Sequence, residues 1–204
     1  MADASSDPLF QRALVNVVRS SADLFPPTAS ETTPSRTWSG LPVVVDEVFT
    51  GLYRLGRITS ASFLGVDADI SVHAKLLTGG LLPLCVTLAS ESIFGAFLDA
   101  SKTKALLHGH SYTAHAVGCN VAKTSVEAML ALDKGGLWRA ARSEWSRSDG
   151  NPQSPWSTWR LAFVTDVSRF DQVDGVFALG SVLALTLKDG ASGTLPRLSR
   201  PPTL

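Results

Sequence analysis

Residues 70–80, ISVHAKLLTGG, place a single lysine, Lys75, between a short β-branched run and a pair of glycines. The run before the lysine is typical of a buried strand, because β-branched residues pack well on a pleated surface. The two glycines favour a loop in which another group approaches the backbone closely. A partly desolvated amine at such a strand end can attack a carbonyl group. An ordinary surface lysine is the alternative interpretation.

Two further apolar runs resemble the one before Lys75. Residues 41–47 (LPVVVDE) and 81–89 (LLPLCVTLA) are continuous in apolarity rather than alternating. Continuous apolarity of strand length favours strands that are buried on both faces, as in a parallel sheet covered by helices. We therefore expect three strands of one such sheet.

Helical patterns flank these strands. An aspartate followed by proline begins a helix over residues 7–24, and a serine cap begins another at residue 90. Residues 113–132 predict a long helix with a small-residue face of Ala114, Gly118 and Ala122. The alternation of strands and helices predicts an α/β domain.

The C-terminal third has a different order of elements. Residues 136–148 and 155–170 are amphipathic and predict helices, and residues 175–190 predict two short strands around Gly180 and Ser181. Helices that lead into a small β unit indicate the start of an α+β domain.

Composition excludes several classes of function. The 204 residues are 45% apolar, and 18 lysines and arginines balance 18 aspartates and glutamates. Without a basic stripe, binding to nucleic acid or to a membrane surface is disfavoured. No apolar run is long enough to span a bilayer and no secretory signal pattern is found, so we expect a mitochondrial or cytoplasmic protein.

The cysteines and tryptophans predict packing rather than chemistry. Cys85 and Cys119 have apolar neighbours and no basic neighbour, so we expect buried, unreactive free thiols. Four of the five tryptophans fall on the amphipathic helices, which favours packing over a ligand-binding box.

Two acids close the first strand run. Asp46 and Glu47 follow PVVV directly. In an open parallel sheet, ligands bind beyond the carboxyl ends of the strands, where a carboxylate can meet a ligand cation. The alternative is a pair of acids that ends a strand at a solvated edge.

Residues 106–115, LLHGHSYTAH, combine histidines with hydroxyl side chains. No acid or cysteine stands at ligand spacing from the histidines, so we predict no metal site. The hydroxyl residues 111–113 precede the long helix, which favours an anion site; a plain helix cap is the alternative. The histidines named in this segment are His108, His110 and His115, and the hydroxyl residues are Ser111, Tyr112 and Thr113.

Three blocks of the sequence resemble consecutive blocks of the class III pyridoxal-phosphate aminotransferases. They are VVVDEVFTGLYRLGR (43–57), HAKLLTGGLLPL (73–84) and HGHSYTAHAVGC (108–119). The similarity runs from about residue 7 to 188. It is greatest to the branch that makes diaminopelargonic acid in biotin synthesis, in the bifunctional form of fungi and plants that also carries dethiobiotin synthetase.

The resemblance assigns roles to individual residues. It implies that Lys75 is the lysine that carries the cofactor, pyridoxal 5′-phosphate, and that Asp46 faces its pyridine nitrogen. It implies that Arg54 lines the substrate site. His110 and Ser111 stand where the family usually has Pro-Thr, which binds the cofactor phosphate of the neighbouring subunit. Phe49 replaces a glutamine of many class III members, a departure that favours the biotin branch.

The resemblance also implies a fold. We expect the second half of a fold-type I large domain, with a mostly parallel sheet covered by helices, followed by the start of an α+β C-terminal domain. The implied division is a large-domain helix (1–25), a Pro/Ser/Thr insertion (26–40), a PLP-binding portion (41–133), a partial small domain (134–190) and an irregular tail (191–204).

The function implied for the complete enzyme is transfer of an amino group from S-adenosylmethionine to 8-amino-7-oxononanoate, giving 7,8-diaminononanoate, by a homodimer. One alternative is another class III aminotransferase that acts on ω-amino acids. A second is a truncated fragment without activity of its own, because we expect the N-terminal half of the enzyme to be missing from this chain.

Overall fold

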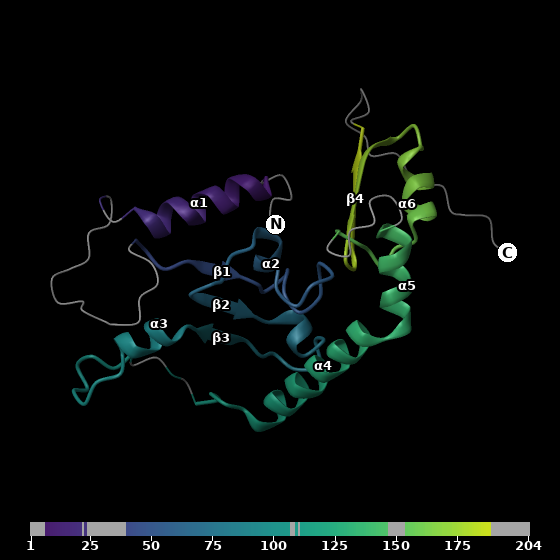
Figure 1. The fold of residues 1–204 in the computed structure, drawn as a ribbon. Helices are drawn as coiled ribbons and strands as arrows, with labels where there is room; N and C mark the ends of the chain where they lie inside the picture. The colour runs from purple at the N-terminus through teal and green to yellow at the C-terminus, as the bar shows by residue number, and fades with distance from the viewer. Residues whose placement is uncertain are drawn as a thin grey trace. The chain divides into compact units, whose positions relative to one another are not determined.

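A computed structural model describes residues 7–21, 23, 40–106, 109, 111–146 and 154–188 (Figure 1). The chain divides into two compact units, Met1–Arg139 and Ala140–Leu204. The tail predicted at 191–204 and the insertion predicted at 26–40, apart from Gly40, lie outside the described residues.

The first unit alternates strands and helices along the chain, as the sequence predicted. Its elements are α1 (Pro8–Ser20), β1 (Val44–Asp46), α2 (Ala61–Leu64), β2 (Ile70–His73), the 3-10 turn η1 (Lys75–Leu77), β3 (Val86–Ala89), α3 (Glu91–Ala96) and α4 (Ala116–Lys134). The helix α5 (Gly136–Trp145) follows directly. The predicted α/β class is confirmed.

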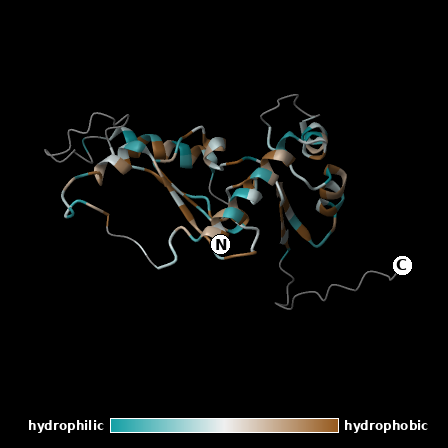
Figure 2. Ribbon diagram, turned by 90° about the horizontal axis from the view of Figure 1, so that it is seen from below, coloured by the Kyte–Doolittle hydropathy of each residue, from teal (hydrophilic) through white to brown (hydrophobic). Residues whose placement is uncertain are grey.

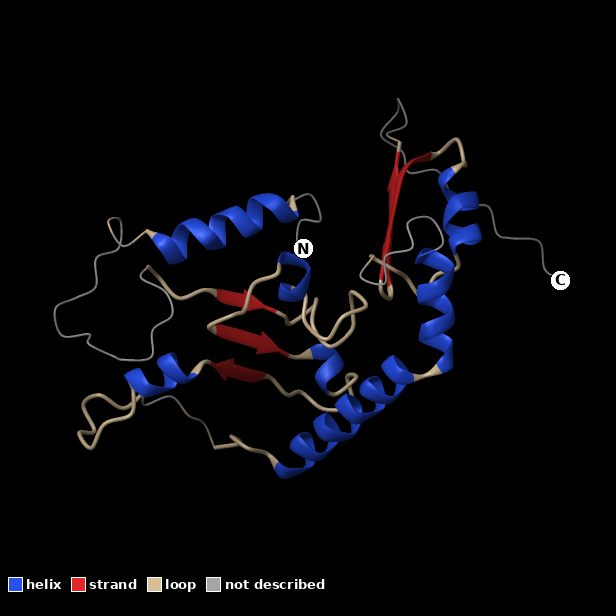
Figure 3. Cartoon of the chain, viewed as in Figure 1, coloured by secondary structure: helices blue, strands red, loops and turns tan. Residues whose placement is uncertain are grey.

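The three strands form one sheet in the order β1-β2-β3. β1 and β2 are parallel, with Asp46 opposite Val72, whereas β3 runs antiparallel to β2 (Figure 3). The parallel pair of β1 and β2 agrees with the predicted sheet, whereas the antiparallel direction of β3 was not predicted. Between β2 and β3 the chain forms only η1 and turns, and without a crossover helix it reverses direction.

The outer strands are more exposed than their apolar sequences predicted. Val44 on β1 is 60% exposed and Leu88 on β3 is 54% exposed. Burial of both strand faces is therefore also a wrong prediction for this chain. Among the described elements, β1 and β3 both have their main contacts with β2.

The helix α1 begins as the sequence predicted. Asp7 caps it by accepting a hydrogen bond from the Leu9 amide at 2.8 Å, and Pro8 occupies the first helical position. Figure 2 shows apolar and polar residues interleaved along the helical ribbons. Leu9 and Phe10 of α1 are 73% and 64% exposed.

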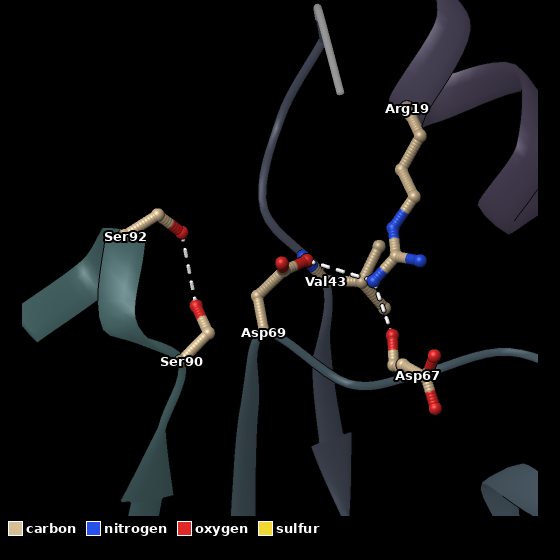
Figure 4. Close-up of polar contacts among 6 residues, drawn as sticks. All are labelled: Arg19, Val43, Asp67, Asp69, Ser90 and Ser92. Carbon is tan, nitrogen blue, oxygen red and sulfur yellow. Dashed lines mark hydrogen bonds and ion pairs between the residues drawn. The ribbon is translucent and has the colours of Figure 1, made fainter. Parts of the chain in front are cut away.

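An ion pair joins the end of α1 to the sheet (Figure 4). Arg19 Nη2 lies 2.9 Å from Asp69 Oδ2, and the Asp67 carbonyl accepts a hydrogen bond from the same nitrogen. Asp69 is 6% exposed and also accepts from the Val43 amide at 2.8 Å. One carboxylate thus holds α1, the start of β1 and the start of β2 together.

Gly40 makes the return from α1 to β1 possible. Its amide donates to the Arg19 carbonyl at 2.9 Å, and a Cβ at this position would lie 1.7 Å from the Val18 carbonyl oxygen. No side chain fits so close to the helix end, which explains the need for glycine here.

The core lies between η1, the segment after β1 and α4. Leu52, Leu77 and Ala122 are buried, and five partly buried side chains surround them: Leu76, Leu84, Val86, Val126 and Met129. The predicted small-residue face of α4 is confirmed at Gly118 and Ala122, which are both buried. Ala114 precedes the helix and is exposed.

Both cysteines are exposed, so the prediction of buried thiols is wrong. Cys85 lies between two partly buried residues, Leu84 and Val86, and in an extended segment its side chain takes the opposite direction. Cys119 follows the buried Gly118 on α4 and lies off the helix's packed face.

The second unit contains α6 (Leu161–Ser168) and a hairpin of β4 (Val173–Leu179) and β5 (Val182–Leu187). The two strands predicted around Gly180 and Ser181 are confirmed. The predicted helix 155–170 is shorter than expected, because the Gly180 carbonyl accepts from Ser157 Oγ and the Thr158 amide, both at 2.8 Å, and holds residues 157–158 against the turn.

The described tryptophans serve packing, as predicted. Trp156 is 6% exposed, and Trp159 stacks on Phe163 with ring centroids 5.7 Å apart. In the first unit the ring centroids of Trp138 and Tyr53 lie 5.3 Å apart. Trp38 lies outside the described residues. Within the described ranges, no helix is both long and apolar enough to cross a membrane.

Candidate active site

The parallel pairing of β1 and β2 brings two chain segments to one edge of the sheet. Asp46 ends β1 opposite Val72. Phe49 lies three residues after Asp46, and Lys75 lies three residues after Val72. Lys75 Nζ lies 5.1 Å from the centroid of the Phe49 ring. The segment after β1 and the segment after β2 therefore meet at Phe49 and Lys75.

Lys75 has a fixed backbone and an exposed side chain. Its φ of +48° lies in the left-handed region, which is uncommon for a residue with a Cβ and often marks a functional site. Buried neighbours hold this conformation: Leu77 is 7% exposed, and Ser125 Oγ of α4 donates to the Leu76 carbonyl at 2.8 Å. The amine makes no hydrogen bond or ion pair with another described residue.

The glycines after Lys75 have a conformational role. Gly79 and Gly80 have φ values of +61° and +86°, and a Cβ on either would meet no atom within 4 Å. Thr78, which is 3% exposed, closes this turn by donating from Oγ1 to the Leu82 carbonyl at 2.6 Å. The backbone after Lys75 therefore forms a turn, and no other atom lies close to its two glycines.

Asp46 is exposed at the end of β1. Its Oδ1 accepts a hydrogen bond from the Val48 amide at 2.9 Å. This bond fixes one carboxylate oxygen. The side chain is exposed at the end of β1, and Lys75 follows the end of the adjacent strand β2. A carboxylate in this position can hold a proton on a cationic ligand.

Glu47 is a structural residue whose importance the sequence analysis missed. It is 1% exposed, and its carboxylate accepts from Thr50 Oγ1 at 2.9 Å, the Ser60 amide at 2.8 Å, the Ala61 amide at 3.2 Å and the Thr59 hydroxyl. These bonds close the segment 47–61 into a loop. The hydroxyl residues at 50, 59 and 60 were the available signal for a buried acceptor.

The loop contains a strained turn. Leu52 and Tyr53 have φ values of +54° and +66°, and Leu52 is 8% exposed in the core. The Tyr53 hydroxyl donates to Asp133 of α4 at 3.1 Å. A Cβ on Gly51 would lie 2.9 Å from the Glu47 carbonyl oxygen and 3.0 Å from His73 Nδ1, so the turn requires glycine there.

The strained turn directs Arg54 back toward the strand ends. The Arg54 amide donates to the Gly51 carbonyl at 3.2 Å, and its guanidinium carbon lies 5.3 Å from the Phe49 ring centroid. Phe49 therefore contacts both Arg54 and Lys75. This brings together three of the residues that the sequence analysis named.

Of the two predicted phosphate-binding residues, the structure describes Ser111. Ser111 is exposed in the turn before α4, and it makes no hydrogen bond with another described residue. His115 caps α4 by accepting from the Gly118 amide at 3.0 Å through Nδ1. His110 and His108 lie outside the described residues. Over the described ranges, no group of three potential metal ligands is present.

The sequence profile of the class III aminotransferases matches residues 38–142, which contain the strand ends, the loop and α4. This chain belongs to the class III aminotransferase family. The resemblance of the three sequence blocks to this family is thereby confirmed.

The similar proteins carry more specific names. A bifunctional dethiobiotin synthetase/adenosylmethionine-8-amino-7-oxononanoate aminotransferase of Emericella nidulans is 54% identical over 187 residues, 90% of this chain and 24% of that protein. A mitochondrial bifunctional dethiobiotin synthetase/7,8-diamino-pelargonic acid aminotransferase of Arabidopsis thaliana is 38% identical over 92% of this chain and 19% of its own length. The chain thus spans a quarter or less of these relatives.

A solved structure supports the fold. The PLP-bound amine transaminase from an uncultivated Pseudomonas species is 25% identical, with a TM-score of 0.57 over 75% of this chain and 32% of that chain. The predicted fold, part of a fold-type I transferase, is confirmed apart from the strand directions and burial described above.

We predict that Glu47→Gln lowers the free energy of unfolding by about 2–3 kcal/mol, because the amide nitrogen then faces hydrogen-bond donors in a buried site. Urea titration of the chain measures this change. The matched control is Glu127→Gln on α4, whose carboxylate is 63% exposed and 3.9 Å from Lys123; it changes the free energy by less than about 0.5 kcal/mol. Equal effects of the two substitutions would contradict the role of Glu47.

Proposed function

We propose that this chain is the cofactor-lysine portion of a PLP-dependent aminotransferase of biotin biosynthesis. The complete enzyme would transfer an amino group from S-adenosylmethionine to 8-amino-7-oxononanoate. The observation that carries the proposal is the 54% identity to the Emericella nidulans protein over nine tenths of this chain. It is supported by the placement of Asp46, Arg54 and Lys75 around one sheet edge.

The residues present fit pyridoxal phosphate. The exposed amine of Lys75 can bond to an aldehyde, and the exposed carboxylate of Asp46 on the adjacent strand can face a ring nitrogen. The open backbone at Gly79 and Gly80 leaves room for a bound group. When bound, pyridoxal phosphate supplies an electron-accepting ring that stabilises the negative charge on a substrate carbon that loses its proton.

Asp46 and Lys75 have separate tasks in this proposal. The Asp46 carboxylate keeps a proton on the ring nitrogen, because an adjacent negative charge favours the cationic form. Lys75 holds the cofactor, and after its release the amine takes the proton from the substrate's α-carbon. A rigid backbone at Lys75 suits both tasks, since the amine must return to the same place in each cycle.

The remaining assignments follow the same proposal. Arg54 lines the substrate site, and His110 and Ser111 bind the phosphate of a cofactor held by the neighbouring subunit, which makes the enzyme a dimer with shared sites. Residues 41–133 and 134–190 belong to the large and small domains. The relative from Arabidopsis is named as mitochondrial, which supports a mitochondrial location of the complete protein.

The function is tested in the complete enzyme with different amino donors. We predict that S-adenosylmethionine supports formation of 7,8-diaminononanoate and that ornithine and β-alanine do not. We also predict that Lys75→Ala lowers the rate by at least about 10⁴-fold, because both the covalent hold and the proton transfer are lost. Lys102→Ala, in an exposed turn, is the matched control and keeps the wild-type rate.

Two outcomes would count against the function. Turnover with ornithine or β-alanine but not with S-adenosylmethionine would assign the enzyme to the ω-amino-acid branch. Wild-type turnover of Lys75→Ala would remove Lys75 from the chemistry.

Shared sites are tested by mixing subunits of the complete enzyme. Lys75→Ala and Ser111→Ala subunits are each impaired alone, whereas a mixed dimer has one site with both changes and one site with neither. Random pairing makes half of the dimers mixed, so we expect recovery of about a quarter of the wild-type activity. Demonstrated mixed dimers without recovery would place Ser111 in the same subunit's site as Lys75.

A further inference from the structure

The ring of Phe49 contacts two cationic side chains at the candidate active site. Lys75 Nζ lies 5.1 Å and the Arg54 guanidinium carbon 5.3 Å from the ring centroid. Both distances are within the roughly 6 Å at which a cation is attracted to the electron-rich face of an aromatic ring. One ring therefore links the predicted cofactor lysine to the predicted substrate arginine.

Phe49 does not contribute to the hydrophobic core. Its side chain is 42% exposed, and it is not a member of the cluster around Leu52 and Leu77. Its position is nevertheless fixed, because the chain immediately before it is held by Glu47 and the chain immediately after it by Thr50. An exposed aromatic ring on an anchored loop is available to bind the side chains beside it.

The ring is also the one described partner of the Lys75 amine. Lys75 makes no hydrogen bond or ion pair with the described residues, and its contact with Phe49 is its recorded interaction. A lysine side chain without a partner samples many rotamers, and fixing it costs conformational entropy. A contact with the ring reduces the set of positions that the amine visits.

We propose that Phe49 is a positioning residue that holds the free amine of Lys75 beside the cofactor position and keeps the Arg54 guanidinium next to it. The catalytic meaning of this contact rests on the proposed function, in which Lys75 is released from the cofactor in each cycle and must return. Once the amine has taken the proton of the substrate's α-carbon it is a cation, and the ring holds it in that form until the proton is passed on. Because Arg54 shares the ring, the substrate-side cation is placed by the same group.

The contact with Lys75 is tested in the complete enzyme after removal of the cofactor. The amines are labelled by reductive methylation with formaldehyde, and the rate at each lysine is measured by mass spectrometry of its peptides. Phe49→Leu removes the aromatic face and keeps an apolar side chain, whereas Phe49→Tyr keeps the face. The rate at Lys75 is divided by the rate at Lys102, which lies in an exposed turn.

We expect Phe49→Leu to raise the relative labelling rate of Lys75 by about two- to fivefold, the change that a partly exposed cation–ring contact is worth. Phe49→Tyr keeps the wild-type rate, which separates the ring's effect from a general disturbance of the loop. Equal labelling in the wild type and both variants would overturn the proposal. So would an equal increase in both variants.

The link to Arg54 is tested in the same enzyme with cofactor bound. Phe49→Leu raises the KM for the keto substrate by about two- to fivefold, and it raises KM no further when Arg54→Ala is already present, because the two changes remove one interaction. Independent effects of the two substitutions would contradict a shared ring. Labelling of Lys75 needs no turnover, so a failure of the proposed function and a failure of the Phe49 contact give different results.

Discussion

The parallel pairing of β1 with β2 is the constraint on which the candidate site depends. It aligns Asp46 with Val72, so that the chain leaving β1 and the chain leaving β2 continue beyond the same edge. A slip of one residue would turn the side chains of β1 to the other face of the sheet and remove Phe49 from Lys75. The buried Asp69 carboxylate favours this register, because it binds the amide of Val43 just before β1 and lies just before β2 itself.

Backbone strain at the site is balanced by burial nearby. Leu52, Tyr53 and Lys75 all have left-handed φ values, each of which costs on the order of 1–3 kcal/mol. Burial of a leucine contributes about 1.5–3 kcal/mol, and both Leu52 and Leu77 are buried against α4. Burial of Leu52 and Leu77 therefore stabilises the backbone conformation of neighbouring residues whose side chains lie outside the core, such as Lys75 and Arg54.

The sequence predicted much of the fold, for identifiable physical reasons, whereas the roles of the site residues stay predictions. The N-terminal cap of α1, the small residues on α4 and the hairpin at Gly180 depend on local rules, and all three are present. The antiparallel direction of β3 depends on how the chain turns after η1, which apolar periodicity does not report. The exposure of Cys85 and Cys119 depends on which side of an element each occupies, and apolar neighbours in sequence do not determine that.

Two site features depend on tertiary contacts more than on local sequence patterns. The role of Glu47 depends on donors that stand up to 14 residues away and meet only when the loop closes. The contact of Phe49 with Lys75 depends on the register of two strands. Local patterns identify the strands, but the register follows from tertiary contacts.

We propose that Lys75 is the lysine that carries the cofactor. It is tested most directly by treating the complete enzyme, saturated with pyridoxal phosphate, with borohydride and mapping the fixed pyridoxyl group by peptide mass spectrometry. We expect one such group per subunit, on Lys75, with Lys102 and Lys104 unmodified. A stoichiometric label on any other lysine, or none on Lys75, would contradict it.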